Sequence, residues 1–472
     1  MAADLLAILN QAGYSLGTQR GLASVASHNI ENANTPGYSR QSAVVTAIQP
    51  NDFVNGQMIG GGAEITGIQQ ARDTFLEYQL PAAFGQAARS SAESGVLGQV
   101  SDLDPSATNG VGSALSQFYA QLQQLSQNPG DPGLRQTVVG QAQTLTQAFK
   151  TTSQSLEANR SAVDTQIAAL VPQVNTLSTQ LASLNQQIIN AAASSTPNDL
   201  MDQRQQVVDQ MEQLTGGHPI PDAKGNISFG LADGTTLVSG VSSATLVTTP
   251  DSTNGNHLKL QIKEPGAVIA SDLPGAIGGQ IGGLIDARDG ALKTAETQLD
   301  GLAFDFANTV NTAHQAGFAL DGTTTGQNFF DLGGLVSSTG AAAAISVSAP
   351  IVADPSLIEA SSTAAGVPGD NGALLGMINT ETAALPSSGA SAEDTVSNMT
   401  AQFGSSVTNA QAISDHDAAW SSNLTQMRQS YSGVSIDEEL INMQTAQTGY
   451  QAVARIITTA QTMLDTLMAL KE

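Results

Sequence analysis

A strict seven-residue repeat of apolar side chains near the end of the chain restricts its possible folds more than any other feature. The repeat and its flanking apolar positions are Ile436, Leu440, Met443, Tyr450, Val453, Ile457, Leu464 and Leu467. This spacing predicts a helix of about 35 residues, on the order of 50 Å long, with one narrow apolar seam. Such a seam needs a second helix to cover it, and we expect that helix to come from the other end of the chain.

The first residues of the chain provide a suitable partner. Apolar residues recur there at steps of three and four, as on one face of a helix: Leu5, Leu9, Ala12 and Leu16. The segment "ANTPGYSRQ" (33–41) must end this helix, because Pro36 lacks an N–H group and Gly37 tolerates positive φ. We therefore expect the two terminal helices to pair, with a sharp break between them and the rest of the chain.

This break also carries polar groups that a simple linker would not need. Tyr38 offers an amphipathic ring and Arg40 a fork of five N–H donors, and both are suited to docking on a neighbouring helix. The segment is therefore interpreted as a hinge that also makes contacts. The candidate assembly motif comprises Asn34, Thr35, Pro36, Gly37, Tyr38, Arg40 and Gln41.

A long helical body is predicted for the middle of the chain. Breaks are expected at "NPGDPG" (128–133) and "SSTPND" (194–199), and Asn198 or Asp199 is expected to cap the helix after the second break. Apolar residues at helical spacing support this prediction, namely Leu177, Leu181, Leu184 and Ile188, and later Ile285, Leu292, Leu299 and Phe306. Further helices are expected over 372–382 and 392–431.

Between residues 216 and 279 the pattern changes to alternating apolar and small polar residues with Gly and Asp-Gly turns, which is typical of antiparallel strands. The predicted fold is mainly α with a small β domain. It has paired N- and C-terminal coiled-coil helices, a long helical-bundle body and an antiparallel β insertion at the tip. The predicted domains are a terminal assembly domain (1–70 and 430–472), a body (71–215 and 280–429, with short strands near 341–352) and a β-rich outer domain (216–279).

Composition excludes several classes of site and partner. The 472 residues include no cysteine, so disulfides, thiolate metal sites and cysteine nucleophiles are absent. Sixteen Lys and Arg against 41 Asp and Glu give a net charge of −25, which argues against nucleic-acid binding. No stretch has the roughly 20 apolar residues that span a membrane. No signal-peptide pattern is present, so the protein either stays in the cytoplasm or leaves by a route without a classical signal.

No constellation of catalytic or metal-binding residues is evident. The five histidines are scattered without helical pairing, so we interpret them as structural: His28, His218, His257, His314 and His416. The glycine clusters match neither a phosphate loop nor a dinucleotide fingerprint, and neither a serine elbow nor a calcium loop is present. We therefore expect no enzymatic activity, no metal and no cofactor.

Several segments together resemble the axial proteins of the bacterial flagellum. The break "ANTPGYSRQ" is similar to their N-terminal signature, and other segments narrow the resemblance to the family of first hook-associated proteins. These segments are "GGAEITGIQQARDTFLEYQL" (61–80), "NDLMDQRQQVVDQM" (198–211), "IGGLIDARD" (281–289), "NTAHQAGFALDG…GQNFF" and the C-terminal "GVSIDEELINMQTAQTGYQAVARIITTAQTMLDTLM". They follow the family's order and cover most of the chain.

The resemblance implies a secreted, non-enzymatic subunit of the hook–filament junction, outside the cell. Its implied partners are further copies of itself in a ring, the hook protein, the next hook-associated protein toward the filament, a cytoplasmic export chaperone and the type III export apparatus. The chaperone would hold the C-terminal helix, and the heptad face would pack between subunits rather than inside a bundle. Many family members carry an extra outer domain where this chain passes from Phe330 almost directly to residues 341–352.

Two alternative functions remain open. One is another axial subunit, such as flagellin or hook protein, although the long helical body and "NDLMDQR" argue against it. The other is a secreted adhesin or enzyme carried on an axial scaffold. Its signature would be an acidic or histidine-rich site within 216–279, and the sequence shows none there.

Overall fold

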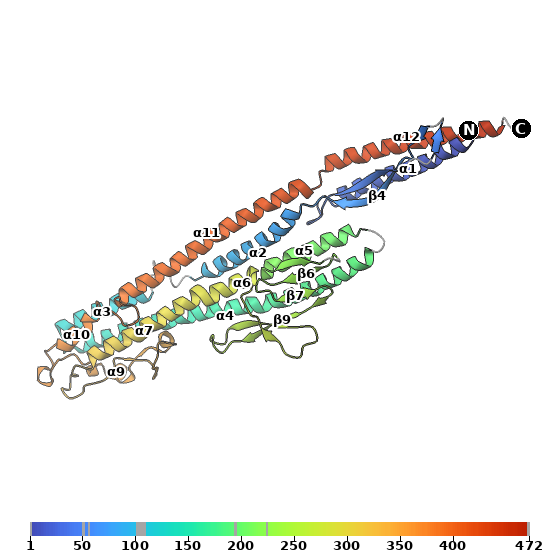
Figure 1. The fold of residues 1–472 in the computed structure, drawn as a ribbon. Helices are drawn as coiled ribbons and strands as arrows, with labels where there is room; N and C mark the ends of the chain where they lie inside the picture. Colours follow the sequence, from blue (N-terminus) through green and yellow to red (C-terminus); the bar gives the residue numbers. More distant parts are fainter. Residues whose placement is uncertain are drawn as a thin grey trace.

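The computed structural model describes residues 2–49, 52–54, 57–100, 110–192, 196–222 and 225–469. The molecule is long, and both ends of the chain lie at the same end of it (Figure 1). There α1 (Ala2–Glu31) and α12 (Ile436–Ala469) run antiparallel and pack along their length. The predicted pairing of the terminal helices is confirmed.

A β-hairpin follows α1, although the sequence gave no clear sign of it. β1 (Gln41–Ala47) pairs antiparallel with β4 (Ala63–Gln70), and the short strands β2 (Asp52–Val54) and β3 (Gln57–Ile59) pair beyond them. The Thr18 hydroxyl on α1 donates to the Ala63 carbonyl at 2.6 Å, which ties the hairpin to the helix. The strands lack a strong apolar alternation because one helix, and not a full core, covers them.

Two helices connect the terminal pair to the body (Figure 1). They are α2 (Thr74–Leu97) and α11 (Ala392–Ser432). Asp73 caps α2 by accepting the N–H groups of Phe75 and Leu76, and Ser391 caps α11. A small apolar cluster between these helices is separate from the main core and consists of Leu76, Leu80, Ala83 and Leu424.

Helices of 6 to 60 residues build the body. They are α3 (Val111–Gln127), α4 (Pro132–Ala191), α5 (Asn198–Thr215), α6 (Gly279–Asp286), the π-helix η1 (Ala287–Leu292) and α7 (Lys293–His314). Both predicted breaks are confirmed, and Asp131 with Pro132 starts α4. The predicted cap of α5 is wrong: Pro197 occupies the cap position without a side-chain hydrogen bond, and Asn198 and Asp199 instead contact residue Gln41.

The end of the molecule farthest from the termini is closed by short elements around an aromatic cluster. They are β12 (Phe330–Asp331), α8 (Ala341–Ala344), β13 (Ser346–Val347), α9 (Ala349–Ala353), η2 (Pro355–Leu357), η3 (Ala364–Gly366) and α10 (Gly372–Asn379). The expectation of strands near 341–352 is largely wrong. Four consecutive alanines favour a helical turn there, and only two residues pair with β12.

The β unit consists of two antiparallel sheets, in the orders β5-β6-β7-β8 and β11-β10-β9. Its strands are β5 (His218–Pro221), β6 (Ile227–Gly230), β7 (Thr236–Ser239), β8 (Ser242–Ser243), β9 (Thr245–Pro250), β10 (Leu258–Lys263) and β11 (Ser271–Asp272). The antiparallel arrangement is confirmed, but the position differs from the predicted tip. The sheets lie along the flank of α4 (Figure 1), where Asn175 bonds both backbone groups of Leu246.

Candidate functional site: the joint between the terminal helices and the body

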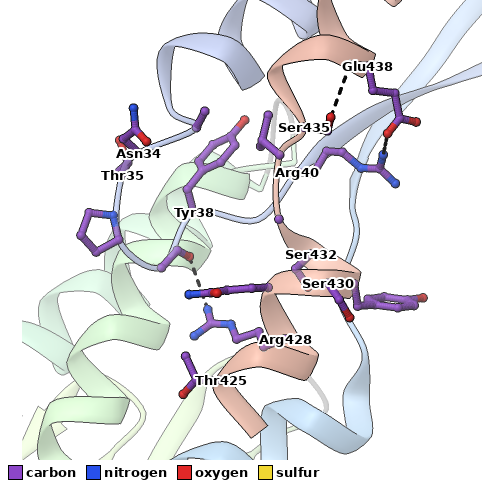
Figure 2. A pocket seen from close by; sticks show the side chains of 17 residues that line it. Asn34, Thr35, Tyr38, Arg40, Thr425, Arg428, Ser430, Ser432, Ser435 and Glu438 are labelled. Atoms are coloured by element: carbon purple, nitrogen blue, oxygen red, sulfur yellow. Dashed lines mark hydrogen bonds and ion pairs between the residues drawn. The ribbon is translucent and has the colours of Figure 1, made fainter. Parts of the chain in front are cut away.

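Three segments that are distant in the sequence meet where the terminal pair joins the body. They are the loop after α1, the first half of α5, and the connector Gly433–Ser435 between α11 and α12. A cleft of about 890 Å³ separates the loop from the connector (Figure 2). We call this region the joint.

Backbone geometry makes the break after α1 a tight turn. The N–H of Thr35 donates to the Asn32 carbonyl at 2.9 Å, and the N–H of Tyr38 donates to the Thr35 carbonyl at 3.2 Å. Gly37 has φ of +76°, and a Cβ atom there would lie 2.7 Å from Nε2 of Gln206 on α5. The positive φ of the turn therefore favours glycine at this position, and the absence of a Cβ atom leaves room for the Gln206 side chain.

Asn29, which sequence reasoning did not single out, holds the turn against α1. Its side-chain amide donates to the Gln41 carbonyl at 2.8 Å and accepts the Gln41 N–H at 2.9 Å and the Tyr38 hydroxyl at 2.8 Å. Asn29 is completely buried. Burial, followed by the nearby charges of Asp199 and Asp202, raises the pKa of Tyr38, so its hydroxyl stays protonated as a donor.

Carboxylates on one face of α5 bind the same loop. Asp199 accepts from the side-chain amide of Gln41 at 2.9 Å, and Asp202 accepts the backbone N–H of Ser39 at 3.3 Å. Asp202 also pairs with Arg72 at 2.6 Å, which fixes the start of the segment leading into α2. The segment "NDLMDQRQQVVDQM" therefore binds the hinge loop through its carboxylates. Its sequence alone did not reveal this role.

The connector between α11 and α12 is attached by two arginines. The backbone N–H of Arg40 donates to the Ser432 carbonyl at 2.9 Å, and its guanidinium lies 3.3 Å from Glu438 on α12 (Figure 2). Arg428 on α11 reaches the Gly37 carbonyl at 3.4 Å and Asp209 of α5 at 3.6 Å. These contacts connect all three segments of the joint.

Only some residues of the candidate assembly motif make contacts with the rest of the chain. Tyr38, Arg40 and Gln41 make the contacts described above, and Gly37 makes the turn. The carbonyl of Pro36 accepts a hydrogen bond from Gln206, whereas the side chains of Asn34, Thr35 and Pro36 are exposed on the loop.

Only part of the predicted heptad face lies in the contact between α1 and α12. Met443, Val453, Ile457, Leu464 and Leu467 are partly buried there. In contrast, the side chains of Ile436, Leu440 and Tyr450 are each more than 40% exposed. Three further residues of α12 are buried on this side of the helix: the small residues Ala446 and Ala460, and Glu439. The heptad pattern did not include them because it was based on large apolar side chains. At the neighbouring Gly449, a Cβ atom would lie 2.7 Å from the end of the Gln19 side chain, so α1 approaches α12 closely at this point.

We expect replacement of Asn29 by alanine to loosen the joint without unfolding the body. Three hydrogen bonds would be lost, and the buried backbone groups of Gln41 would lack partners. Amide hydrogen exchange of Gln41 should accelerate roughly 30-fold or more, corresponding to about 2 kcal/mol. Asn34→Ala, in the same loop but exposed, is the control. Unchanged protection of Gln41 in Asn29→Ala would contradict this role.

Two buried carboxyl groups on α5 lie beneath the joint. Burial raises the pKa of Asp209 to about 6, although Gln205 and Arg428 oppose the shift. Burial and then the charge of Asp209 raise the pKa of Glu212 to about 9, and Oε1 of Glu212 has no hydrogen-bond partner. Glu212 is therefore neutral at pH 7, whereas in an unfolded chain it would be ionised.

The raised pKa of Glu212 gives its contribution to stability a definite pH dependence. This contribution is fully present below about pH 4.5 and is lost as the pH rises through about 9. Glu212→Gln, which cannot ionise, should raise the free energy of unfolding by about 2–4 kcal/mol at pH 8 and change it little at pH 4. Thermal melts at both pH values test this, with the exposed Glu264→Gln as control. An equal effect of Glu212→Gln at both pH values would disprove the assignment.

The two most buried histidines have structural partners, as expected. His314 donates to the Gln327 carbonyl at 2.8 Å and accepts the Glu359 N–H at 2.9 Å, and burial lowers its pKa to about 4. His257 lies 2.7 Å from Asp164. Across the described residues, no three histidine or carboxylate side chains come together in a way that could hold a metal ion. Among all the residues that the structure describes, no helix is both long enough and apolar enough to cross a membrane.

Comparison with known proteins associates the chain with the flagellum. Residues 97–330 match the profile described as the flagellar hook-associated protein FlgK helical domain, and residues 425–470 match that of the flagellar basal body rod FlgEFG protein C-terminal. The structure of the flagellar hook junction protein FlgK from Burkholderia pseudomallei matches with a TM-score of 0.67 at 19% sequence identity. That match covers 76% of this chain and 100% of that chain, and it shows a shared fold.

Two relatives named flagellar hook-associated protein 1 show different extents of similarity. The Bacillus subtilis strain 168 protein is 26% identical over 491 aligned positions, covering 97% of this chain and 96% of that protein. The Escherichia coli strain K12 protein is 26% identical over 332 residues, covering 69% of this chain and 60% of that protein. The chain thus spans about three fifths of the length of its enterobacterial relatives.

The chain is a flagellar axial protein by class. This follows from its paired terminal helices, from the hinge that the body binds, and from the two matching profiles. Within this class, the chain carries the FlgK helical domain over residues 97–330 and is similar along most of its length to proteins named flagellar hook-associated protein 1.

Proposed function

We propose that the chain is a structural, non-enzymatic subunit that joins the flagellar hook to the filament. The observation that carries this proposal is the joint, which holds the pair α1–α12 in one orientation relative to the body through contacts from three segments. A subunit that must present its terminal helices to neighbours at a fixed angle requires such a device. The relatives named flagellar hook-associated protein 1 support the same role.

The terminal pair retains an apolar face that α1 does not cover. Ile441 lies opposite the seam and Ile456 and Met463 lie beside it, and the three side chains are each at least 49% exposed. Exposed apolar side chains on one helix face are typical of a surface that another molecule covers. We therefore assign the contacts with further copies, with the hook protein and with the next hook-associated protein to this face, and we assign the seam to pairing with α1.

Export through the flagellar type III apparatus, followed by assembly outside the cell, completes the proposed function. A cytoplasmic chaperone would hold α12 before export, at a stage when α12 is not paired with α1. The apolar residues of the seam are then available to it. This sequence of events places the chain at the hook–filament junction after secretion.

Deletion of the gene from the parent bacterium tests the proposed function. We expect cells with hooks but without attached filaments, and flagellin released into the medium. Expression of the intact chain from a plasmid should restore attached filaments. If the chain were flagellin or hook protein, the deletion would instead abolish flagellin itself or the hook. Normal filaments in the deletion strain would contradict every axial role.

A further inference from the structure

The first half of α2 and the end of α11 lie against α5 without sharing the main core of the body. We call residues 74–85 of α2 and 424–432 of α11 the arm base. Its apolar cluster is separate from the main core and consists of Leu76, Leu80, Ala83 and Leu424, with Phe84 against it. We therefore expect the arm base to separate from α5 at a lower free energy than global unfolding requires.

Five charged side chains form a row between the arm base and α5: Asp202, Arg72, Glu77, Arg428 and Asp209. The nitrogen–oxygen distances between successive members are 2.6, 3.5, 4.0 and 3.6 Å, and each side chain is at most 19% exposed. Arg72 makes a short hydrogen bond with Asp202, whereas the described partners of Arg428 lie 3.4 Å or more from it. The end of the row at Arg428 and Asp209 is therefore its weakly held end.

The row contains three carboxylates and only two guanidinium groups, and this imbalance favours a proton on one carboxyl group when the row is buried. Asp209 is the best placed of the three, because it lies at the weakly held end. Burial is the main reason that the pKa of Asp209 rises to about 6. The hydrogen bond from Gln205 and the charges of Arg428 and Arg72 oppose this rise in pKa, and the charge of Glu77 adds to it.

Glu212 lies one turn further along α5 and is covered by α2. A Cβ atom at Gly85 of α2 would lie 2.9 Å from the Glu212 carbonyl oxygen, so the two helices are in close contact there. The Glu212 side chain is buried, and its Oε1 atom has no hydrogen-bond partner. Burial and then the charge of Asp209 keep Glu212 neutral. Water that reached this face of α5 would hydrate both carboxyl groups and favour their ionisation.

We propose that Asp209 and Glu212 form a proton-sensitive switch for the arm base, which lies on α5 while both carboxyl groups are neutral and lifts from it more readily once they ionise. The covered arrangement holds the protons more tightly than the open one, because ionised carboxylates gain hydration on opening. The preference for the covered arrangement is fully present below about pH 3.8. It is lost as the pH rises through about 6 for Asp209 and about 9 for Glu212.

Lifting of the arm base loosens the joint. Arg428 contacts the Gly37 carbonyl of the loop after α1, and the Ser432 carbonyl at the end of α11 accepts the N–H of Arg40. Separation of α11 from α5 therefore releases this loop from the body, and the terminal pair loses its fixed orientation. The switch is a property of the free chain and does not depend on the proposed function.

Amide hydrogen exchange of the isolated chain tests the switch. The exchange rates of Leu80 and Leu424 in the arm base are compared with that of Leu145 in α4, each divided by the intrinsic rate at the same pH. We expect the arm-base amides to exchange faster than Leu145, and their protection to fall roughly 100-fold or more between pH 5 and pH 8. Asp209→Asn should remove roughly tenfold of this fall and Glu212→Gln most of the remainder, since neither new side chain can ionise.

Three results would overturn the switch. Equal protection of the arm base and α4 at both pH values would show that the arm base opens only when the whole body unfolds. An unchanged pH response in both Asp209→Asn and Glu212→Gln would show that opening does not uncover these carboxyl groups. An equal effect of Glu264→Gln, an exposed control, would assign the response to net charge. None of these results bears on the proposed function, which the deletion strain tests separately.

Discussion

Ile457→Asp and Ile456→Asp, one residue apart on α12, should disable the protein in different ways. Ile457 lies in the seam with α1, so a carboxylate there should separate the terminal pair in the free chain, at a local cost of about 2–4 kcal/mol. Ile456 is 49% exposed at the edge of the seam, so its replacement should disturb the free chain less and block contacts with neighbours. Both variants should therefore fail to attach filaments.

Limited proteolysis distinguishes the two mechanisms. Ile457→Asp should lose approximately the first 40 and last 40 residues rapidly, because unpaired terminal helices are readily cleaved. Ile456→Asp should be cleaved like the wild type. The melt of the body should not change in either variant, since the main core includes no residue of α1 or α12. Gln451→Asp, exposed on the same helix, is the control, and secretion of every variant is measured first.

Two results would contradict this division of the helix into faces. Rapid terminal cleavage of Ile456→Asp would show that its face is needed within the free chain. Attached filaments in a secreted Ile456→Asp variant would show that the exposed face does not hold the junction together.

Removal of the β unit should unfold the body, even though its two ends meet. The N–H of Gly278 donates to the Thr215 carbonyl at 2.8 Å, so a short Gly-Ser linker in place of residues 218–277 closes the gap without strain. The unit nevertheless shares the main core with α4. Its buried apolar side chains are Phe229, Leu231, Leu237, Val238, Leu246, Leu260 and Ile262.

The expected loss is large because each of these side chains contributes about 1.5–3 kcal/mol when fully buried. The sum, roughly 10–20 kcal/mol, is as large as the whole stability typical of a domain, about 5–15 kcal/mol, so the deleted chain should aggregate or melt without cooperativity. Calorimetry and size-exclusion chromatography measure this. As a control, shortening only the exposed loop between β10 and β11, which contains Val268 and Ile269, should leave the melt unchanged. A cooperative melt after deletion of the whole unit would show that the body folds without it.

The sequence predicted the long helices well because their apolar periodicity is local. Both breaks of the body, the pairing of the terminal helices and the antiparallel β unit followed from spacing and turn residues. The position of the β unit did not, because it depends on which face of α4 is left open. Asn175 and Asn185, which bind the sheets to α4, look like ordinary polar positions of a surface helix.

The joint was predictable in part. Proline and glycine predicted the turn, Tyr38 and Arg40 were identified as contact residues, and Gln41 was included in the candidate motif. Their partners were not, because Asn29, Asp199 and Asp202 gain their roles only when the chain folds back on itself. The heptad pattern likewise favoured large apolar residues, whereas close packing of α1 on α12 needs small ones such as Ala446 and Ala460.

Gold labelling of isolated flagella tests the central claim most directly. Antibodies against the β unit, which lies on the outside of the body away from the terminal pair (Figure 1), are applied to purified hooks with attached filaments and viewed by electron microscopy. The account expects gold in a narrow band where each filament meets its hook, and no label on the hooks of the deletion strain. Label along the filament or along the hook, or none on intact flagella, would contradict it.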